Sequence, residues 1–125
     1  MFDVINKTKG KAPNLPFCDI KNCVVGKNYE LSCVFIGDMR SKIFNKKYRN
    51  IDKPTNILSF SFDKNSGEIF INLNRAKQEA SHFNKNTKNF IGFLFIHGLL
   101  HLKGFSHSST MEQREKILCK KFNIY

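Results

Sequence analysis

The stretch FIGFLFIHGLLHLKGFSH, residues 90–107, decides the fold of this chain. Its first part is apolar at nearly every position, which is typical of a buried helix. We expect this helix to cover residues 88–103 and to end at Gly104, because glycine tolerates the left-handed turn that ends many helices. The stretch is therefore expected to form the central helix of the fold.

Strand and helix patterns alternate in the first part of the chain. Residues 1–6 and 29–37 predict strands, and residues 17–25 predict a short helix between them. Asp38 is expected to cap a helix that runs to Arg49, with Met39 and Ile43 marking the faces of that helix. These elements form a strand–helix–strand–helix succession.

Three further elements surround the central helix in sequence. Residues 57–72 alternate apolar and polar side chains on both sides of the turn sequence KNSG, which predicts a β-hairpin. Residues 73–83 have helical spacing, and Ser109 with Glu112 fits a capping box that opens a last helix. The predicted fold is one α+β domain over residues 1–125, with a small mixed four-stranded sheet and about five helices.

The composition indicates a globular protein with an excess of positive charge. Hydrophobic residues make up 41% of the 125, so the chain can bury a core. Lys and Arg number 21 against 10 acidic residues, which gives a net charge of +11. Such an excess favours encounter with polyanions such as nucleic acid, although lysines used for solubility produce the same count.

The compartment is expected to be the cytoplasm. The chain has no signal pattern at its N-terminus and no apolar run of the roughly 18 residues that a membrane span needs. Its cysteines form no C-x-x-C pair and are expected to be free buried thiols in a reducing environment. The four are Cys18, Cys23, Cys33 and Cys119.

The histidines of the central stretch predict a metal site. His97 and His101 are four residues apart, a rise of about 6 Å and a rotation of about 400° along a helix, so both leave the same face. After the helix stops at Gly104, the chain can return and present His107 to the same point. Three imidazoles make a zinc site with a fourth position left open. His82 is expected to be an ordinary surface histidine.

The histidine spacing equals that of the metzincin proteases, H-E-x-x-H-x-x-G-x-x-H, but the glutamate is missing. Gly98 stands in its place, and peptide hydrolysis by that route needs the carboxylate to take a proton from water. A protease is therefore disfavoured. Glycine costs about 1 kcal/mol in a helix relative to alanine, which suggests that another segment approaches closely at residue 98.

A basic segment precedes the predicted hairpin. Arg49 is flanked by Lys46, Lys47 and Lys53. An arginine fork can bind two phosphate oxygens and stabilise the charge that grows during phosphoryl transfer. Cations at a helix C-terminus also interact favourably with the helix dipole, so the segment alone does not decide the chemistry.

Together, these motifs resemble the YbeY family of endoribonucleases, the bacterial ribosomal-RNA maturation factors. The family's metal motif, H-G-x-L-H-L-x-G-Y-D-H, is similar to HGLLHLKGFSH at 97–107. Its central motifs N-x-x-Y-R and K-P-T-D-V-L-S-F-P correspond to 45–49 and to KPTNILSFS at 53–61, and MEQREKIL at 111–118 also matches. Asn56 and Ser106 stand where the family has aspartates.

The resemblance implies a zinc-dependent endoribonuclease that cuts single-stranded RNA. His97, His101 and His107 would hold one zinc ion, and Arg49 matches the family's functional arginine. It also implies action on 16S rRNA 3′ ends, ribosome quality control, and the ribosome or its proteins as partners. Lys46, Lys47 and Lys53 are expected to hold the RNA backbone. The alternative from another class is a non-catalytic ribosome-assembly factor with a structural metal.

Overall fold

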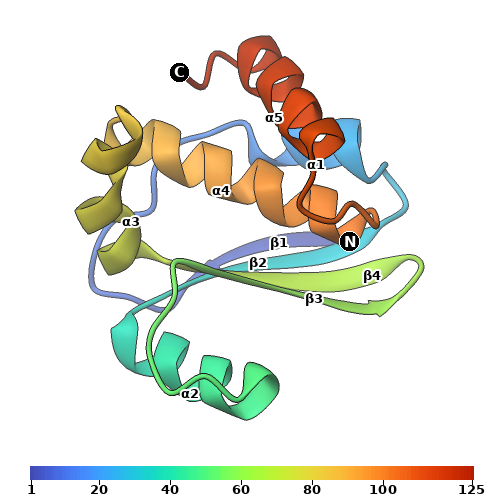
Figure 1. Ribbon diagram of the computed structural model, residues 1–125. Helices are drawn as coiled ribbons and strands as arrows, with labels where there is room; N and C mark the ends of the chain where they lie inside the picture. Colours follow the sequence, from blue (N-terminus) through green and yellow to red (C-terminus); the bar gives the residue numbers. More distant parts are fainter.

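One sheet lies between helices on its two faces (Figure 1). The computed structural model covers residues 1–125. The elements in chain order are β1 (Phe2–Asn6), α1 (Phe17–Val24), β2 (Glu30–Ile36), α2 (Asp38–Arg49), β3 (Ile57–Asp63), β4 (Ser66–Asn72), α3 (Leu73–Glu79), the 3-10 helix η1 (Ala80–Phe83), α4 (Thr87–Leu102) and α5 (Ser109–Lys121). The predicted α+β class, the four-stranded mixed sheet and the five α-helices are confirmed.

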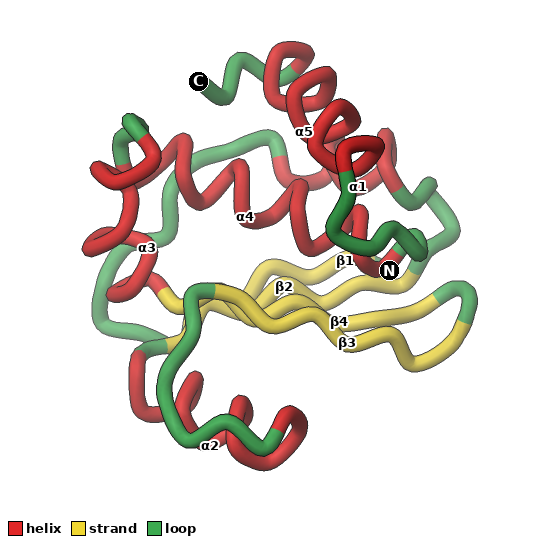
Figure 2. Tube along the Cα trace, viewed as in Figure 1, coloured by secondary structure: helices red, strands yellow, loops and turns green.

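The sheet has the strand order β1-β2-β4-β3. The pairs β1–β2 and β2–β4 are parallel, whereas β3 and β4 form the antiparallel hairpin predicted for 57–72. Its turn is shorter than expected, because Ser66 and Gly67 already belong to β4. Helices α1, α4 and α5 lie above the sheet, and α2 lies below it (Figure 2). The strand β3 is left at an edge.

The central helix α4 forms the core, as predicted. Phe95, Ile96 and Leu99 on this helix are fully buried. The Phe17 ring from α1 packs edge-on against Phe95 at 5.1 Å and also contacts Phe35 of β2 at 5.8 Å. Burying one such side chain stabilises the folded state by about 1.5–3 kcal/mol. The sequence of α4 therefore places its polar exceptions, the histidines, at one defined end of the core.

Helix α2 differs from the prediction in its buried face. Met39 and Ile43 are 78% and 55% exposed, and the buried positions are the polar Ser41 and Asn45. Ser41 Oγ donates to the Thr55 carbonyl at 2.8 Å, and Asn45 Nδ2 donates to the carbonyl of residue 53 at 2.8 Å. These bonds satisfy backbone groups of the partly buried loop after α2, which apolar side chains cannot do. They fix the segment that leads from α2 into β3.

Two predicted helix caps are wrong, each by one residue. The residue before α2 is Gly37, and the Asp38 carboxylate accepts hydrogen bonds from the Asn72 and Asn74 side chains. At α5 the cap is Ser108, whose hydroxyl accepts from the Met111 N–H at 3.2 Å. A capping side chain must precede the first helical turn, and Ser109 already lies within that turn.

Two of the four cysteines are buried, and two are exposed. Cys33 and Cys119 are buried as predicted, but Cys18 and Cys23 are exposed, because α1 presents both to solvent. All four cysteines are free. No helix combines the length and the apolar character that crossing a bilayer requires.

Candidate metal centre

Three histidines converge where α4 ends. His97 and His101 project from the same face of the last turns of α4, and Gly104, with φ +108°, reverses the chain after it. The returning loop brings His107 to the same point. One ring nitrogen from each histidine lies within 4.8 Å of the others, so the three side chains can hold one metal ion. The structure thus brings together the three histidines that their spacing predicted.

Hydrogen bonds fix the orientation of two of the imidazoles. Nδ1 of His97 lies 2.7 Å from Oε2 of Glu115, a buried carboxylate on α5. Nδ1 of His101 lies 3.0 Å from the Phe105 carbonyl. Both partners are acceptors, so the proton of each neutral ring sits on Nδ1. The Nε2 lone pairs are then free, which is the arrangement that metal-binding histidines use.

The free nitrogens fit a metal ion. Nε2 of His97 and Nε2 of His101 are 3.1 Å apart. Because the proton of each ring is on Nδ1, neither Nε2 atom can donate a hydrogen bond to the other. The two Nε2 lone pairs therefore face each other. Two nitrogens on one tetrahedral zinc at about 2.0–2.1 Å are separated by about 3.3–3.4 Å, close to this distance. A cation between them turns a repulsive contact into two bonds.

The local environment keeps His101 neutral. Burial lowers the pKa of His101 from its usual 6.5, and the neighbouring His97 lowers it further, while the hydrogen bond to Phe105 opposes them. A lowered pKa leaves the unprotonated imidazole available at neutral pH, and only that form binds a metal.

Gly98 explains why the helix and the sheet can meet at this site. A Cβ atom on residue 98 would lie 2.9 Å from both Ile57 Cδ1 and Ser59 Oγ of β3, and 3.1 Å from Ile69 Cδ1 of β4. The close approach predicted from glycine at this position is therefore present, and the approaching segment is the β3–β4 hairpin. Ser59 Oγ also lies 3.5 Å from the Gly98 carbonyl.

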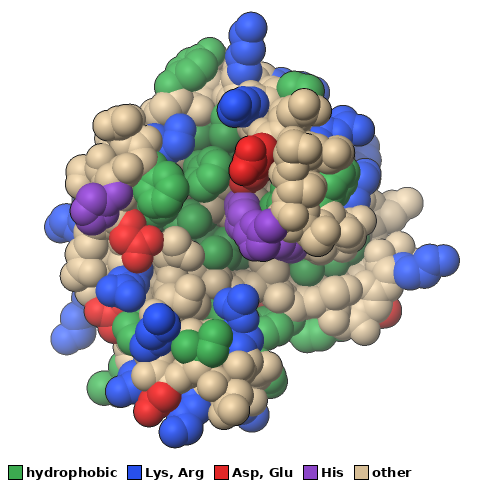
Figure 3. Space-filling model, viewed as in Figure 1, with side chains coloured by type: hydrophobic (Ala, Val, Ile, Leu, Met, Phe, Trp, Pro, Cys, Tyr) green, Lys and Arg blue, Asp and Glu red, His purple; other side chains and the backbone are tan.

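Arg49 lines a hollow of about 560 Å³, which we name the arginine hollow. All three histidines line it, together with residues 55–60 at the start of β3. Figure 3 shows a histidine patch at the surface, with Lys and Arg side chains below it over α2. Of the four basic residues singled out from the sequence, only Arg49 lines the hollow. Lys46 instead forms an ion pair with Asp52 at 3.6 Å.

The two departures from the family motif lie in different surroundings. Asn56 lines the arginine hollow, and its Nδ2 donates to Glu79 Oε1 at 2.9 Å. An aspartate could not donate there. Ser106 is exposed in the loop before His107, and only its carbonyl takes part in a hydrogen bond, from Ser108 Oγ at 3.1 Å.

Glu115 was not singled out as a site residue from the sequence, apart from its place in a matching motif. A signal for it does exist. Met111, Glu115 and Cys119 recur every four residues on α5 and are all buried. A lone carboxylate on the buried stripe of a helix requires a partner. Finding that partner, His97, requires the packing of α5 on α4.

Fold and site together define an α+β protein with a histidine triad able to hold one metal ion, beside an arginine-bearing hollow. The model of the Endoribonuclease YbeY family matches residues 17–124. The chain belongs to the YbeY family of endoribonucleases, enzymes that hydrolyse RNA.

Individual relatives agree with this assignment. The chain is 37% identical over 103 residues to endoribonuclease YbeY of Acholeplasma laidlawii, covering 79% of this chain and 72% of that protein. It is 34% identical over 131 residues to the Nautilia profundicola protein of the same name, covering 99% and 93%. The fold matches the solution structure of TM1509 from Thermotoga maritima with a TM-score of 0.69 at 22% identity, over 98% of this chain and 89% of that one.

Proposed function

We propose that this protein is a zinc-dependent endoribonuclease that cuts single-stranded RNA in the cytoplasm. The observation that carries the proposal is the arginine hollow, because one arginine and three histidines line the same open space. An RNA phosphodiester that enters the hollow can contact both kinds of side chain at once. A closed site with four protein ligands would instead favour a structural metal.

Each residue has a distinct part in this proposal. His97, His101 and His107 hold the ion, and Glu115 orients the His97 ring through its Nδ1 proton. When bound, zinc supplies Lewis acidity at a phosphoryl oxygen and lowers the pKa of water. Arg49 binds the phosphate through its two-pronged guanidinium and stabilises the extra negative charge of the transition state.

The overall charge supports an RNA substrate. The net charge of +11 attracts a polyanion over the whole surface, and binding through such charge weakens steeply with salt. We infer that the substrate is the 3′ end of 16S rRNA and that the protein acts in ribosome maturation and quality control, with the ribosome or its proteins as partners. Family membership supports this finer assignment.

Two variants with matched controls test the proposal. Bound metal and cleavage of a single-stranded RNA from the 16S 3′ region are measured for wild type, His101→Ala and Arg49→Ala. His82→Ala and Arg40→Ala are the controls, because both residues are exposed and lie outside the arginine hollow.

We expect His101→Ala to lose both the metal and cleavage. Arg49→Ala should keep the metal and cleave about 10²- to 10³-fold more slowly, the usual effect of removing one charge-stabilising donor. Cleavage by His101→Ala at the wild-type rate would overturn the metal-dependent mechanism. Tight RNA binding by a metal-loaded wild type without any cleavage would favour the non-catalytic assembly factor.

A further inference from the structure

A second hollow adjoins the histidines on the side away from Arg49. It has a volume of about 380 Å³ and lies between α4 and α5, and we name it the α4–α5 hollow. His97 and His107 line both this hollow and the arginine hollow. The two hollows therefore adjoin at His97 and His107.

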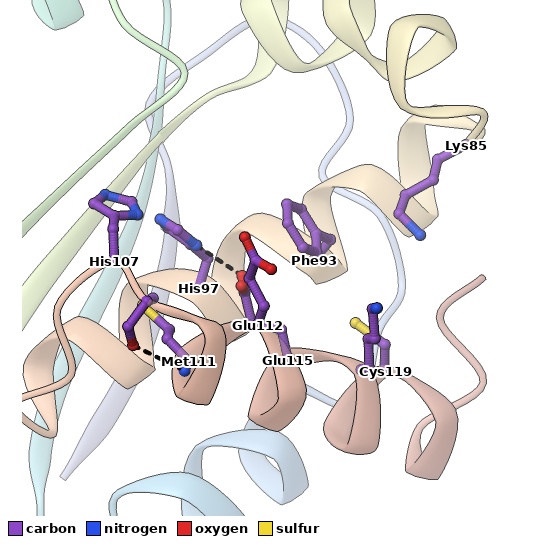
Figure 4. Close-up of a pocket in the computed structure, with 10 residues that line it drawn as sticks. Lys85, Phe93, His97, His107, Met111, Glu112, Glu115 and Cys119 are labelled. Atoms are coloured by element: carbon purple, nitrogen blue, oxygen red, sulfur yellow. Dashed lines mark hydrogen bonds and ion pairs between the residues drawn. The ribbon is translucent and has the colours of Figure 1, made fainter.

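The α4–α5 hollow has an aromatic wall. Phe93 stands one turn before His97 on α4, and its half-buried ring faces the hollow (Figure 4). The centroid of the Phe90 ring lies 6.1 Å from that of Phe93, with 20° between the ring planes, and the Phe83 centroid lies 6.3 Å away. This packing fixes the orientation of the Phe93 ring. Met111 and Cys119 extend the apolar lining. Such a surface suits the face of a flat heteroaromatic ring.

The rim of the same hollow has charged groups. Glu112 is exposed, and its carboxylate forms no ion pair. The Glu115 carboxylate, in contrast, is paired with His97. Figure 4 shows Glu112 between His97 and Phe93. Lys85 places its Nζ 5.8 Å from the centroid of the Phe93 ring, and Lys116 also lines the hollow. One free acceptor and two cations thus surround the aromatic wall.

We propose that the α4–α5 hollow is a nucleobase subsite for the nucleotide next to the cleaved phosphate. The base lies against the Phe93 ring, and N–H groups on its Watson–Crick edge donate hydrogen bonds to the Glu112 carboxylate. Lys85 and Lys116 bind the following phosphate. Guanine fits best, because its adjacent N1–H and N2–H groups match the two oxygens of one carboxylate. This inference rests on the proposed ribonuclease function.

The test measures binding separately from cleavage. The affinity for short single-stranded oligonucleotides is followed by fluorescence anisotropy for wild type, Phe93→Leu and Glu112→Gln, and electrophoresis of each sample checks that the oligonucleotide is still intact. Phe93→Trp checks for rescue by another aromatic ring. Phe62→Leu and Glu30→Gln are the controls, because both residues are exposed and line neither hollow.

We expect Phe93→Leu to weaken binding about ten-fold, Phe93→Trp to restore it, and Glu112→Gln to abolish a preference for guanine over uracil. Wild-type affinity in Phe93→Leu, or an unchanged base preference in Glu112→Gln, would overturn the subsite. Failure of the ribonuclease function is seen separately, as a metal-loaded wild type that cuts no RNA. A wild type that cuts RNA while both variants bind as it does would remove the subsite alone.

Discussion

Oε2 of Glu115 lies 2.7 Å from Nδ1 of His97, so a carboxylate on α5 sets the orientation of an imidazole on α4. The contact joins two helices that are separated by a loop carrying His107. The last helix therefore belongs to the metal centre as much as to the core.

Replacing Glu115 with Gln is expected to lower zinc affinity about 10- to 100-fold, the usual effect of removing such a partner. Gln keeps the size of the side chain, but it loses the charge and has an NH2 donor in place of one acceptor oxygen. Competition with a chromogenic chelator measures the affinity. Glu112→Gln on the same helix is the control, and equal zinc affinity in the two variants would contradict the role of Glu115.

Gly98→Glu is expected to destabilise the fold by more than about 3 kcal/mol and to produce no peptidase. Overpacking costs about 1–3 kcal/mol, and a buried carboxylate adds to it, since Ile57 and Ser59 occupy the space beside residue 98. Gly98→Ala should cost less, because the atoms it meets are side-chain ends that can shift. Urea unfolding checks both, and a stable Gly98→Glu protein that cuts peptides would refute the expectation.

Asn56→Asp, which restores the family's residue, is expected to destabilise this protein by about 1–3 kcal/mol at pH 7. It replaces an amide that donates to Glu79 with a carboxylate that repels it. The loss should shrink as the pH falls toward 4, because one of the two carboxyls then binds a proton. Denaturant unfolding at both pH values measures this, and adding Glu79→Gln should remove most of the effect.

The metal-free protein is expected to lose stability as the pH falls below about 6.5. The pKa of His101 is lowered in the folded state by burial and by His97, so the unfolded chain binds more protons between the two pKa values. The free energy of unfolding therefore decreases on acidification until the pH lies below the folded pKa. Unfolding in the presence of a chelator at several pH values checks this, and His101→Gln should show a smaller decrease than wild type.

The sequence predicts well that the three histidines meet, because their positions depend on local rules. The helical period places His97 above His101, and Gly104 allows the chain to reverse toward His107. The hairpin and the buried strands follow equally from alternation and turn residues.

Features that depend on packing between distant segments could not be predicted. The buried face of α2 is polar because Ser41 and Asn45 bind the backbone of a loop that follows the helix. The partner of Glu115 is known only when α5 lies on α4. Ser109 with Glu112 fits the capping-box pattern in the sequence, but the helix already includes Ser109, so Ser108 is the cap.

The position of β3 at the edge of the sheet has a consequence for how a substrate is held. Unpaired main-chain groups on an edge strand usually promote association between molecules. Here residues 55–60 line the arginine hollow, so RNA bound there as we propose would lie beside that edge. Main-chain donors and acceptors are the same whatever side chain they carry. The hydrogen-bonding pattern of this edge therefore does not depend on which side chains occupy it. Substitutions in β3 are expected to leave the main-chain contacts available to a bound strand unchanged.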